Sequence, residues 1–146
     1  MSFGFGIGDF IAIGQLAHSL YKDVYLIARG APEEIRVLMG EIAILSQSID
    51  LLIQELENPD SILIRAGETR VTMVNQVMMQ AKGTLHELES FAKKHDFNVG
   101  AGEKPRYKRV WDKVKFAREK SSVDALRLKV QYHNGNMNLL LTSVAR

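Results

Sequence analysis

The sequence contains no cysteine among its 146 residues. Disulfide bonds, zinc-thiolate centres and thiol nucleophiles are therefore excluded within this stretch of chain. Proline is also scarce, with three residues, and tryptophan occurs once. The remaining composition, 46% hydrophobic and 25% charged, is that of a folded globular protein. Because this length suits one compact domain, we expect residues 1–146 to form a single domain.

The net charge is small, at +2, but the charges are unevenly distributed. Residues 32–68 contain eight acidic and two basic residues, whereas residues 104–146 contain eleven basic and three acidic residues. Two explanations are open. Either the two segments attract each other within the fold, or the basic segment forms a surface for an anionic partner.

Strand patterns with a period of two residues are missing, and helical patterns take their place. Apolar residues recur at steps of three and four along four segments, as in helices that each bury one stripe. Long helices with short connections predict an all-α, antiparallel four-helix bundle, in which 1–30 form a glycine-rich N-terminal arm and helix and 31–146 the remainder. The four stripes comprise Phe10, Ile13, Ala17, Leu20, Val24 and Ile27, then Ile35, Leu38, Ile42, Leu45, Ile49, Leu52 and Leu56, then Val74, Met78, Ala81, Leu85, Leu88, Ala92 and His95, and finally Leu126, Val130, His133, Met137, Leu140 and Val144.

Capping residues and helix-breaking residues predict where the helices begin and end. Asn58 and the proline after it stop the second helix, and Asp60 and Ser61 are both candidate caps for the earliest start of the third. An additional short basic helix is expected over residues 106–118. A capping box formed by Ser121 and Asp124 then begins the last long helix.

Catalytic groups are sparse. The four histidines are scattered over different segments, and His86 lacks the second histidine of a zinc-binding His-Glu-x-x-His helix. His95 and His133 fall on apolar stripes, where packed imidazoles are expected. The acidic residues of the second helix lie off its stripe, which favours a solvated face over a di-metal site. The glycines at 4–8 lack both the preceding strand and the following Lys-Ser/Thr pair of a phosphate-binding loop. We therefore expect no enzyme, no metal and no cofactor.

Two segments suit a membrane surface instead. In the aromatic-rich arm over residues 2–14, Gly4 and Gly8 have the Gly-x-x-x-Gly spacing of close helix contacts in lipid. The alternative is a packed or flexible tail. A basic cluster interleaved with aromatic residues suits anionic lipid headgroups, and also nucleic-acid phosphates. Its alternative is a helix paired with the acidic second helix. The cluster comprises Lys104, Arg106, Lys108, Arg109, Lys113, Lys115, Arg118 and Lys120.

The opening residues, from Phe3-Gly-Phe-Gly-Ile-Gly-Asp-Phe-Ile-Ala-Ile-Gly14 to Leu16-Ala17 and Tyr21, resemble the start of the HeLo-like domains at the N-termini of fungal NOD-like (STAND) receptors and related cell-death proteins. The resemblance extends through Ala31-Pro32-Glu33-Glu34, the second helix, Arg109-Val-Trp111, Val123-Asp124-Ala-Leu126-Arg127, His133 and Leu139-Leu-Leu141. It implies a cytoplasmic helical bundle held inactive in a larger receptor, next to a nucleotide-binding or amyloid-signalling module. When triggered, such a bundle oligomerises, moves to the plasma membrane and permeabilises it through the N-terminal helix.

We therefore expect a membrane-targeting, cell-death-inducing bundle whose partners are anionic lipids and further copies of itself. An oligomerisation or adaptor domain without membrane activity is the main alternative. A nucleic-acid-binding bundle is disfavoured because no recognition motif is present. The first helix should be held more weakly than the others, and leucine at Gly8 or Gly14 should impair membrane activity while the soluble bundle stays folded. The expected membrane-inserting residues are Phe3, Gly4, Phe5, Gly6, Ile7, Gly8, Asp9, Phe10, Ile11, Ile13 and Gly14.

Overall fold

The computed structural model describes residues 7–27, 33–58, 60–61, 67–94 and 113–144, and within them the side chains at 7, 23–27, 68, 93–94, 113–119 and 144 lie outside the description. This part of the chain contains four helices and no strand. They are α1 (Ile7–Ile27), α2 (Glu33–Glu57), α4 (Glu68–Lys94) and α6 (Lys113–Val144). The predicted all-α four-helix bundle is confirmed.

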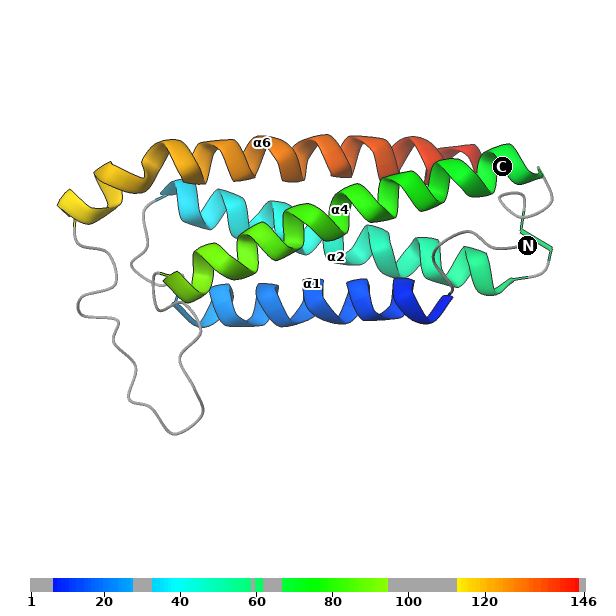
Figure 1. The fold of residues 1–146 in the computed structure, drawn as a ribbon, viewed down its shortest axis with the longest axis horizontal. Helices are drawn as coiled ribbons and strands as arrows, with labels where there is room; N and C mark the ends of the chain where they lie inside the picture. The colour runs from blue at the N-terminus through cyan, green and yellow to red at the C-terminus, as the bar shows by residue number, and fades with distance from the viewer. Residues whose placement is uncertain (1–6, 28–32, 59, 62–66, 95–112, 145–146) are drawn as a thin grey trace.

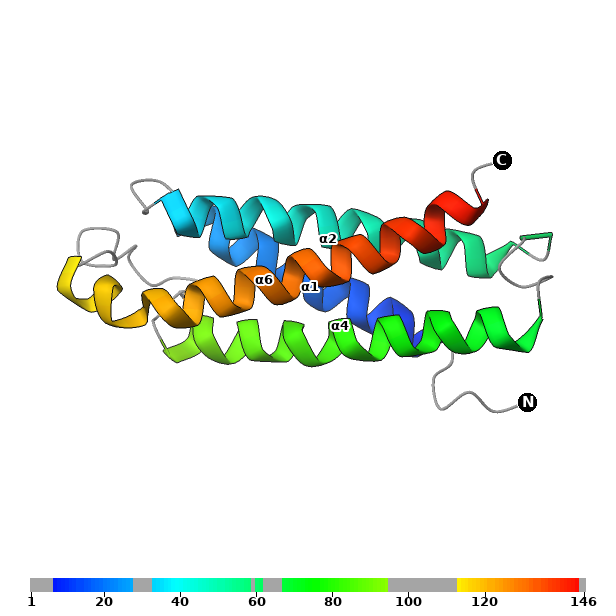
Figure 2. The same ribbon diagram turned by 90° about the horizontal axis from the view of Figure 1, so that it is seen from above.

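Consecutive helices run in opposite directions, but the packing order around the bundle is not the order in the sequence (Figure 1). α2 packs against α1 and α6, and α4 packs against α6 and α1. As a result α2 and α6 are parallel neighbours, as are α1 and α4. Seen from above, α6 lies nearest the viewer and crosses between α2 and α4 (Figure 2). α6 therefore presents one long face to solvent.

The predicted stripes form one hydrophobic core. Every predicted stripe residue whose side chain is described is buried, except Leu56, which is partly buried and packs against the core. α2 contributes the most large side chains, with Ile35, Leu45 and Leu52 among those that are completely inaccessible to solvent. Burying each large apolar side chain contributes roughly 1.5 to 3 kcal/mol, so this core supplies most of the driving force for folding.

Two helix starts differ from the sequence prediction. α6 runs without interruption through Ser121, so the expected capping box does not begin a helix there. Val123 is buried and continues the core stripe of the same helix, and Lys120 forms an i,i+4 ion pair of 3.1 Å with Asp124. Residues 113–118 of the expected short basic helix thus form the first turns of α6, and residues 106–112 lie outside the described residues.

α4 begins at Glu68 rather than near Asp60. Asn58 instead caps a turn after α2, in which its side-chain oxygen accepts a 3.0 Å hydrogen bond from the backbone N–H of Asp60. Gly67 then precedes α4 with a φ of 103°, a left-handed conformation that glycine adopts without strain. Its carbonyl accepts the first helical hydrogen bond, from the N–H of Val71 at 3.2 Å.

Candidate functional site

The candidate membrane-inserting residues divide between the two sides of α1. Phe10, Ile13 and Gly14 are buried in the bundle, whereas Gly8, Asp9 and Ile11 are exposed. Ile7 opens α1, but its side chain lies outside the described part, as do all of Phe3, Gly4, Phe5 and Gly6. The apolar side of α1 therefore faces the core, and it can reach lipid only after α1 separates from its neighbours.

Two contacts fix the position of α1 on α2. A Cβ atom added at Gly14 would lie 3.4 Å from the Ile53 Cδ1 atom and 3.5 Å from the Ile49 Cγ2 atom, within ordinary van der Waals contact, so α1 packs closely on α2 at this position. One turn further along α1, the His18 Nε2 atom lies 2.8 Å from the Asp50 Oδ2 atom. Asp50 therefore contacts α1, whereas the sequence predicted that it lies on a solvated face of the second helix.

Gly8 differs from Gly14, which corrects the expectation that leucine at either position leaves the soluble bundle undisturbed. A Cβ atom added at Gly8 would meet nothing within 4 Å. A leucine at Gly14 would extend into the space that Ile49 and Ile53 of α2 already occupy. Gly8 is therefore the position at which membrane activity can be tested without altering the described packing of α1.

The described side chains of α1 include fewer buried large apolar residues than those of α2, but the stripe residues Val24 and Ile27 of α1 are not among them. Among the described side chains, α1 buries three large apolar residues, Phe10, Ile13 and Leu20, whereas α2 buries six. At roughly 1.5 to 3 kcal/mol each, these amount to about 5 to 9 kcal/mol for α1 and about 9 to 18 kcal/mol for α2. The expected difference in stability between the two helices remains a prediction.

Only one member of the basic cluster has a described side chain. Lys120 is half-exposed and pairs with Asp124 at 3.1 Å, and its Nζ atom lies 4.0 Å from a carboxylate oxygen of Glu34 on α2. At Lys120, this geometry favours the explanation in which the basic and acidic segments of the chain attract each other within the fold. Lys113, Lys115 and Arg118 belong to α6 without described side chains, and Lys104, Arg106, Lys108 and Arg109 lie outside the described residues.

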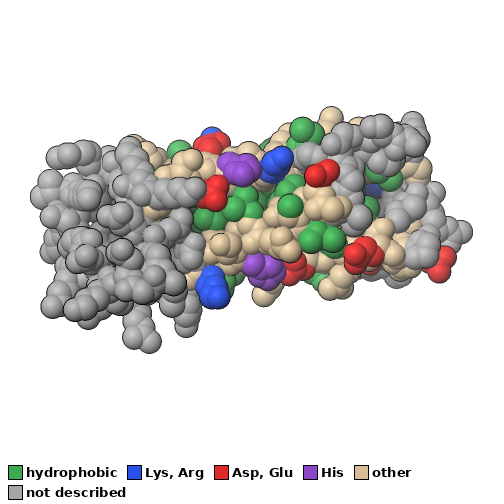
Figure 3. Space-filling view, turned by 60° about the horizontal axis from the view of Figure 1, so that its bottom comes forward, with side chains coloured by type: hydrophobic (Ala, Val, Ile, Leu, Met, Phe, Trp, Pro, Cys, Tyr) green, Lys and Arg blue, Asp and Glu red, His purple; other side chains and the backbone are tan. Residues whose placement is uncertain are grey.

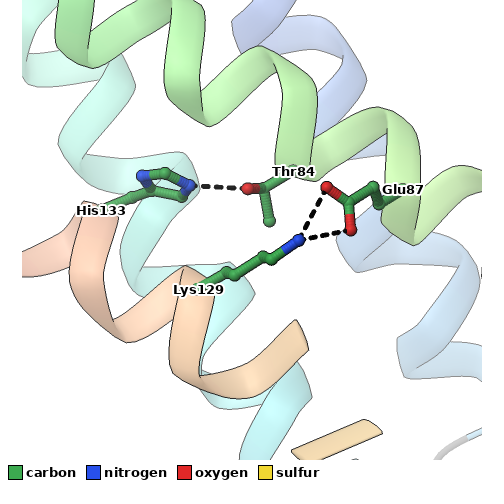
Figure 4. Close-up of polar contacts among 4 residues, drawn as sticks. All are labelled: Thr84, Glu87, Lys129 and His133. Atoms are coloured by element: carbon green, nitrogen blue, oxygen red, sulfur yellow. Dashed lines mark hydrogen bonds and ion pairs between the residues drawn. The ribbon is translucent and has the colours of Figure 1, made fainter. Parts of the chain in front are cut away.

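The seam between α4 and α6 holds a buried polar contact (Figure 4). His133 is 5% exposed, as its place on the stripe predicted, and its Nε2 atom lies 2.7 Å from the Thr84 hydroxyl oxygen. One turn away, the Lys129 ammonium donates to both carboxylate oxygens of Glu87, at 2.8 and 3.0 Å. Burial lowers the pKa of His133, and the charge of Lys129 adds to this effect, while Glu87 opposes it.

The His133 ring is therefore neutral near pH 7. Its Nδ1 atom is buried and has no hydrogen-bond partner among the described residues, so the tautomer with the proton on Nε2, donated to Thr84, is favoured. Shallow hollows of about 510 and 430 Å³ lie along this seam. The sequence offered one missed signal: Thr84 occupies an apolar register between Ala81 and Leu88, where a hydroxyl requires a partner.

No arrangement in the described residues resembles a catalytic or metal centre. The described histidines occupy separate places: His18 pairs with Asp50, His86 lies 3.4 Å from Glu89, and His133 contacts Thr84. His95 lies outside the described residues. No group of three or more His, Cys, Asp or Glu side chains converges within the described part of the chain. What the described side chains support is helix packing.

One described helix, α2, is long and apolar enough to cross a bilayer by length and composition. α2 contributes six residues to the hydrophobic core, and the core helix of a soluble protein can pass the same test. Its hydropathy is therefore weak support for a membrane span. Charged side chains are scattered among exposed hydrophobic ones on the side of the bundle where α1 lies (Figure 3).

Comparisons with known proteins add no family to these observations. No protein-family model, no curated protein and no solved structure matches the chain. The resemblance to HeLo-like domains thus stays a prediction that rests on the quoted residues.

Proposed function

We propose that this chain is a membrane-targeting, cell-death-inducing helical bundle that oligomerises and permeabilises the plasma membrane through α1. The observation that carries the proposal is the place of α1 in the bundle. α1 packs against α2 and α4, while the contacts of α6 with both of those helices do not involve α1. α2, α6 and α4 thus stay connected when α1 leaves. In this mechanism α1 moves from the core into lipid and the other three helices remain together.

The dimensions and composition of α1 suit that role. Its 21 residues span about 31 Å at 1.5 Å per residue, close to the ~30 Å hydrocarbon thickness of a bilayer. Between Phe10 and Tyr21 it contains no Asp, Glu, Lys or Arg. The apolar face of α1, which includes Ile13 and Leu20, is buried in the bundle. When α1 inserts, lipid replaces the neighbouring helices around this face, so its apolar area stays out of water.

Two polar side chains of α1 determine when insertion is favourable. Asp9 is exposed, and an ionised carboxylate at the bilayer centre costs at least ~2.5 kcal/mol unless it faces water or a partner. His18 loses its contact with Asp50 as α1 departs. Several copies of α1 around a water-filled lumen would give both side chains a polar environment, which is why the proposal includes oligomerisation.

A reversible disulfide tests whether α1 must leave the bundle. Because the chain has no cysteine, Gly14→Cys combined with Ile49→Cys creates a unique pair between α1 and α2. A Cβ atom at position 14 lies 3.5 Å from the Ile49 Cγ2 atom, which is one bond from the Ile49 Cβ atom, and disulfide-bonded Cβ atoms are about 3.5 to 4.5 Å apart.

Dye leakage from anionic liposomes should be low for the oxidised double variant and should return on reduction. The reduced form of the same protein is the matched control, and Gly14→Cys alone controls for the oxidant. Equal leakage from the oxidised and reduced forms would overturn the mechanism.

The second candidate is an oligomerisation or adaptor domain that never enters lipid. It is favoured by the burial of Phe10 and Ile13 and by the apolar side chains that α2 and α6 expose. Self-association without leakage, from either redox form of the double variant or from the unmodified chain, would select this candidate.

A further inference from the structure

α6 carries a second stripe of mainly apolar residues, and this one faces solvent. Its buried stripe includes Val130 and Met137. A second set of positions follows the same alternation of three and four residues, but every member is exposed. Leu128, Tyr132 and Leu139, at 61%, 62% and 71%, are the three most exposed large hydrophobic side chains in the described part of the chain. The exposed set, which we call the outer stripe, consists of Ala125, Leu128, Tyr132, Gly135, Leu139 and Thr142.

The outer stripe is directed away from the bundle. At 100° per residue, its mean direction lies nearly opposite that of the buried stripe of α6. Figure 2 shows α6 in front of α2 and α4, so no other described helix covers this side. Toward α4, Leu128 and Tyr132 border the shallow hollow of about 430 Å³ that Gln80 and Thr84 also line. The outer stripe is therefore an exposed ridge with free space beside it.

The outer stripe contains no charged residue, and its borders are polar. Between residues 125 and 142, Gln131 and Asn138 flank the stripe on one side, and Lys129 and Asn136 flank it on the side of α4. The Lys129 ammonium is paired with Glu87 at 2.8 Å, so its charge is balanced within the chain. An uncharged row that alternates three and four residues between polar borders is the pattern of a helix that packs along another helix.

We propose that the outer stripe is a self-association surface on which α6 of a second copy of this chain packs antiparallel about a two-fold axis. The proposal rests on the self-association within the proposed function and assigns it a surface. A two-fold contact uses the same stripe on both copies, so one self-complementary row is sufficient. α6 packs against α2 and α4 within the bundle, and the stripe is distinct from α1, which stays accessible to lipid in the dimer.

The sizes of the side chains favour a second copy and fix its direction. An antiparallel register centred between residues 133 and 134 matches all six positions in pairs. The largest side chain, Tyr132, then meets Gly135 of the second copy, where an added Cβ atom would have no neighbour within 4 Å. In a parallel pair Tyr132 would meet its own counterpart and Gly135 would meet another glycine, so one layer would be crowded and another left empty. The antiparallel pairs are Tyr132 with Gly135, Leu128 with Leu139, and Ala125 with Thr142.

The size of the contact sets its strength. Residues 125–142 extend about 27 Å, and a helix with its side chains is about 11 Å wide, so the contact covers roughly 300 Å² on each copy. A standard interface covers ~800 Å² per partner, so this contact gives a weak, reversible dimer with a dissociation constant of roughly 10 to 1,000 µM. Such a contact forms chiefly where copies are concentrated, as in an assembly on a membrane.

Sedimentation equilibrium without lipid, at about 10 µM to 1 mM of the complete chain, tests the contact. Gly135→Leu should weaken dimerisation at least about tenfold, because it fills the space that receives Tyr132. Gly40→Leu is the matched control, since Gly40 of α2 is also an exposed helical glycine with nothing within 4 Å of an added Cβ atom. Leu139→Glu should also weaken the dimer at least about tenfold by placing an unpaired charge in the contact, whereas Met79→Glu, at a 55% exposed position of α4, should not. Circular dichroism should show the same helicity for all four variants.

Disulfide formation reports the direction of the pair. Because the chain has no cysteine, Ala125→Cys and Thr142→Cys each introduce a single thiol. An equal mixture of the two variants should form a mixed disulfide on oxidation, since the antiparallel register places these positions opposite each other. Ala125→Cys alone should form little dimer, because its two thiols then lie about 25 Å apart along the helices.

Four results would overturn the proposal. They are a chain that stays monomeric at every concentration, equal weakening by Gly40→Leu and Gly135→Leu, equal disulfide formation by Ala125→Cys alone and by the mixture, and a loss of vesicle binding in Leu139→Glu when the unmodified chain is monomeric without lipid. The last result would assign the outer stripe to a membrane surface. Leakage by the variant with cysteines at positions 14 and 49 is read separately, so a failed dimer test with redox-controlled leakage rejects this surface and keeps the proposed function.

Discussion

Substitutions at Gly8 and Gly14 measure how closely α1 is seated on α2. A Cβ atom at Gly14 would lie 3.4 Å from the Ile53 Cδ1 atom, at the near limit of ordinary van der Waals contact, whereas a Cβ atom at Gly8 has no neighbour within 4 Å. Alanine therefore fits at both positions. Leucine fits only at Gly8, because its remaining carbon atoms at Gly14 would overlap Ile49 and Ile53.

The magnitudes follow from two opposing effects. Replacing a glycine within a helix by alanine stabilises the helix by up to ~1 kcal/mol, so Gly14→Ala should be neutral or slightly stabilising. Gly14→Leu gains a similar propensity but overpacks the contact at a cost of about 1 to 3 kcal/mol, so it should destabilise by up to ~2 kcal/mol. Gly8→Leu, in the first turn of α1, should change stability by less than about 0.5 kcal/mol.

Urea unfolding followed by circular dichroism gives these free energies of unfolding, provided that the slopes agree among the variants. Liposome leakage then adds a functional readout. Gly8→Leu should reduce leakage by blocking close helix contacts in lipid, although it leaves the stability of the soluble bundle unchanged. If Gly14→Leu were as stable as Gly14→Ala, α1 would not be seated on Ile49 and Ile53, and the reasoning would be refuted.

Three further predictions concern the rest of the bundle. Leu45→Ala and Leu140→Ala should each destabilise by about 2 to 5 kcal/mol, and denaturant melts that show less than ~0.5 kcal/mol for both would contradict the packing of α2 and α6. His133 has a lowered pKa in the folded chain, so the unfolded chain binds its proton first as the pH falls. Stability from this group is complete above about pH 6.5 and declines below it by at most ~1.4 kcal/mol per pH unit, and His133→Gln should remove that component from a pH series of urea melts. Charge reversal within the basic cluster, at Lys108, Arg109, Lys113 and Lys115, should reduce co-sedimentation of the protein with anionic vesicles while its helicity stays unchanged. Co-sedimentation equal to that of the unmodified chain would show that the cluster has no role in lipid binding.

The choice of buried residues was predictable from the sequence because helical periodicity decides it locally. The stripe through Ile35, Leu45 and Leu52 is buried as predicted, and His133 is a packed imidazole. The same logic has a limit at Ile44, which is apolar but lies outside the stripe and is 51% exposed. A periodic pattern identifies which side of a helix is most apolar, and it does not show whether a second apolar row is covered by another molecule.

The helix boundaries depended on a competition between local capping motifs and the burial of apolar side chains, and the motif alone does not show which of the two prevails. Ser121 and Asp124 have the spacing of a capping box, yet Val123 is buried and extends the core stripe toward the start of α6, so continuing the helix buries more apolar area than starting a new one. At α4 the start is fixed by the left-handed conformation of Gly67, which the sequence allowed but did not require.

The sequence by itself determined that the chain is helical and which stripes are buried, because both properties arise from residues within a few positions of one another. Only the tertiary structure decided which helices are neighbours. The stripes of α2 and α6 are each compatible with any apolar partner, and their parallel contact emerges when all four stripes are buried together. The pairs His18–Asp50 and Thr84–His133 also depend on that arrangement, since each joins residues more than thirty positions apart. Only the packed bundle reveals that Gly14 contacts α2 while Gly8 does not, and that difference separates two glycines that the sequence treats alike.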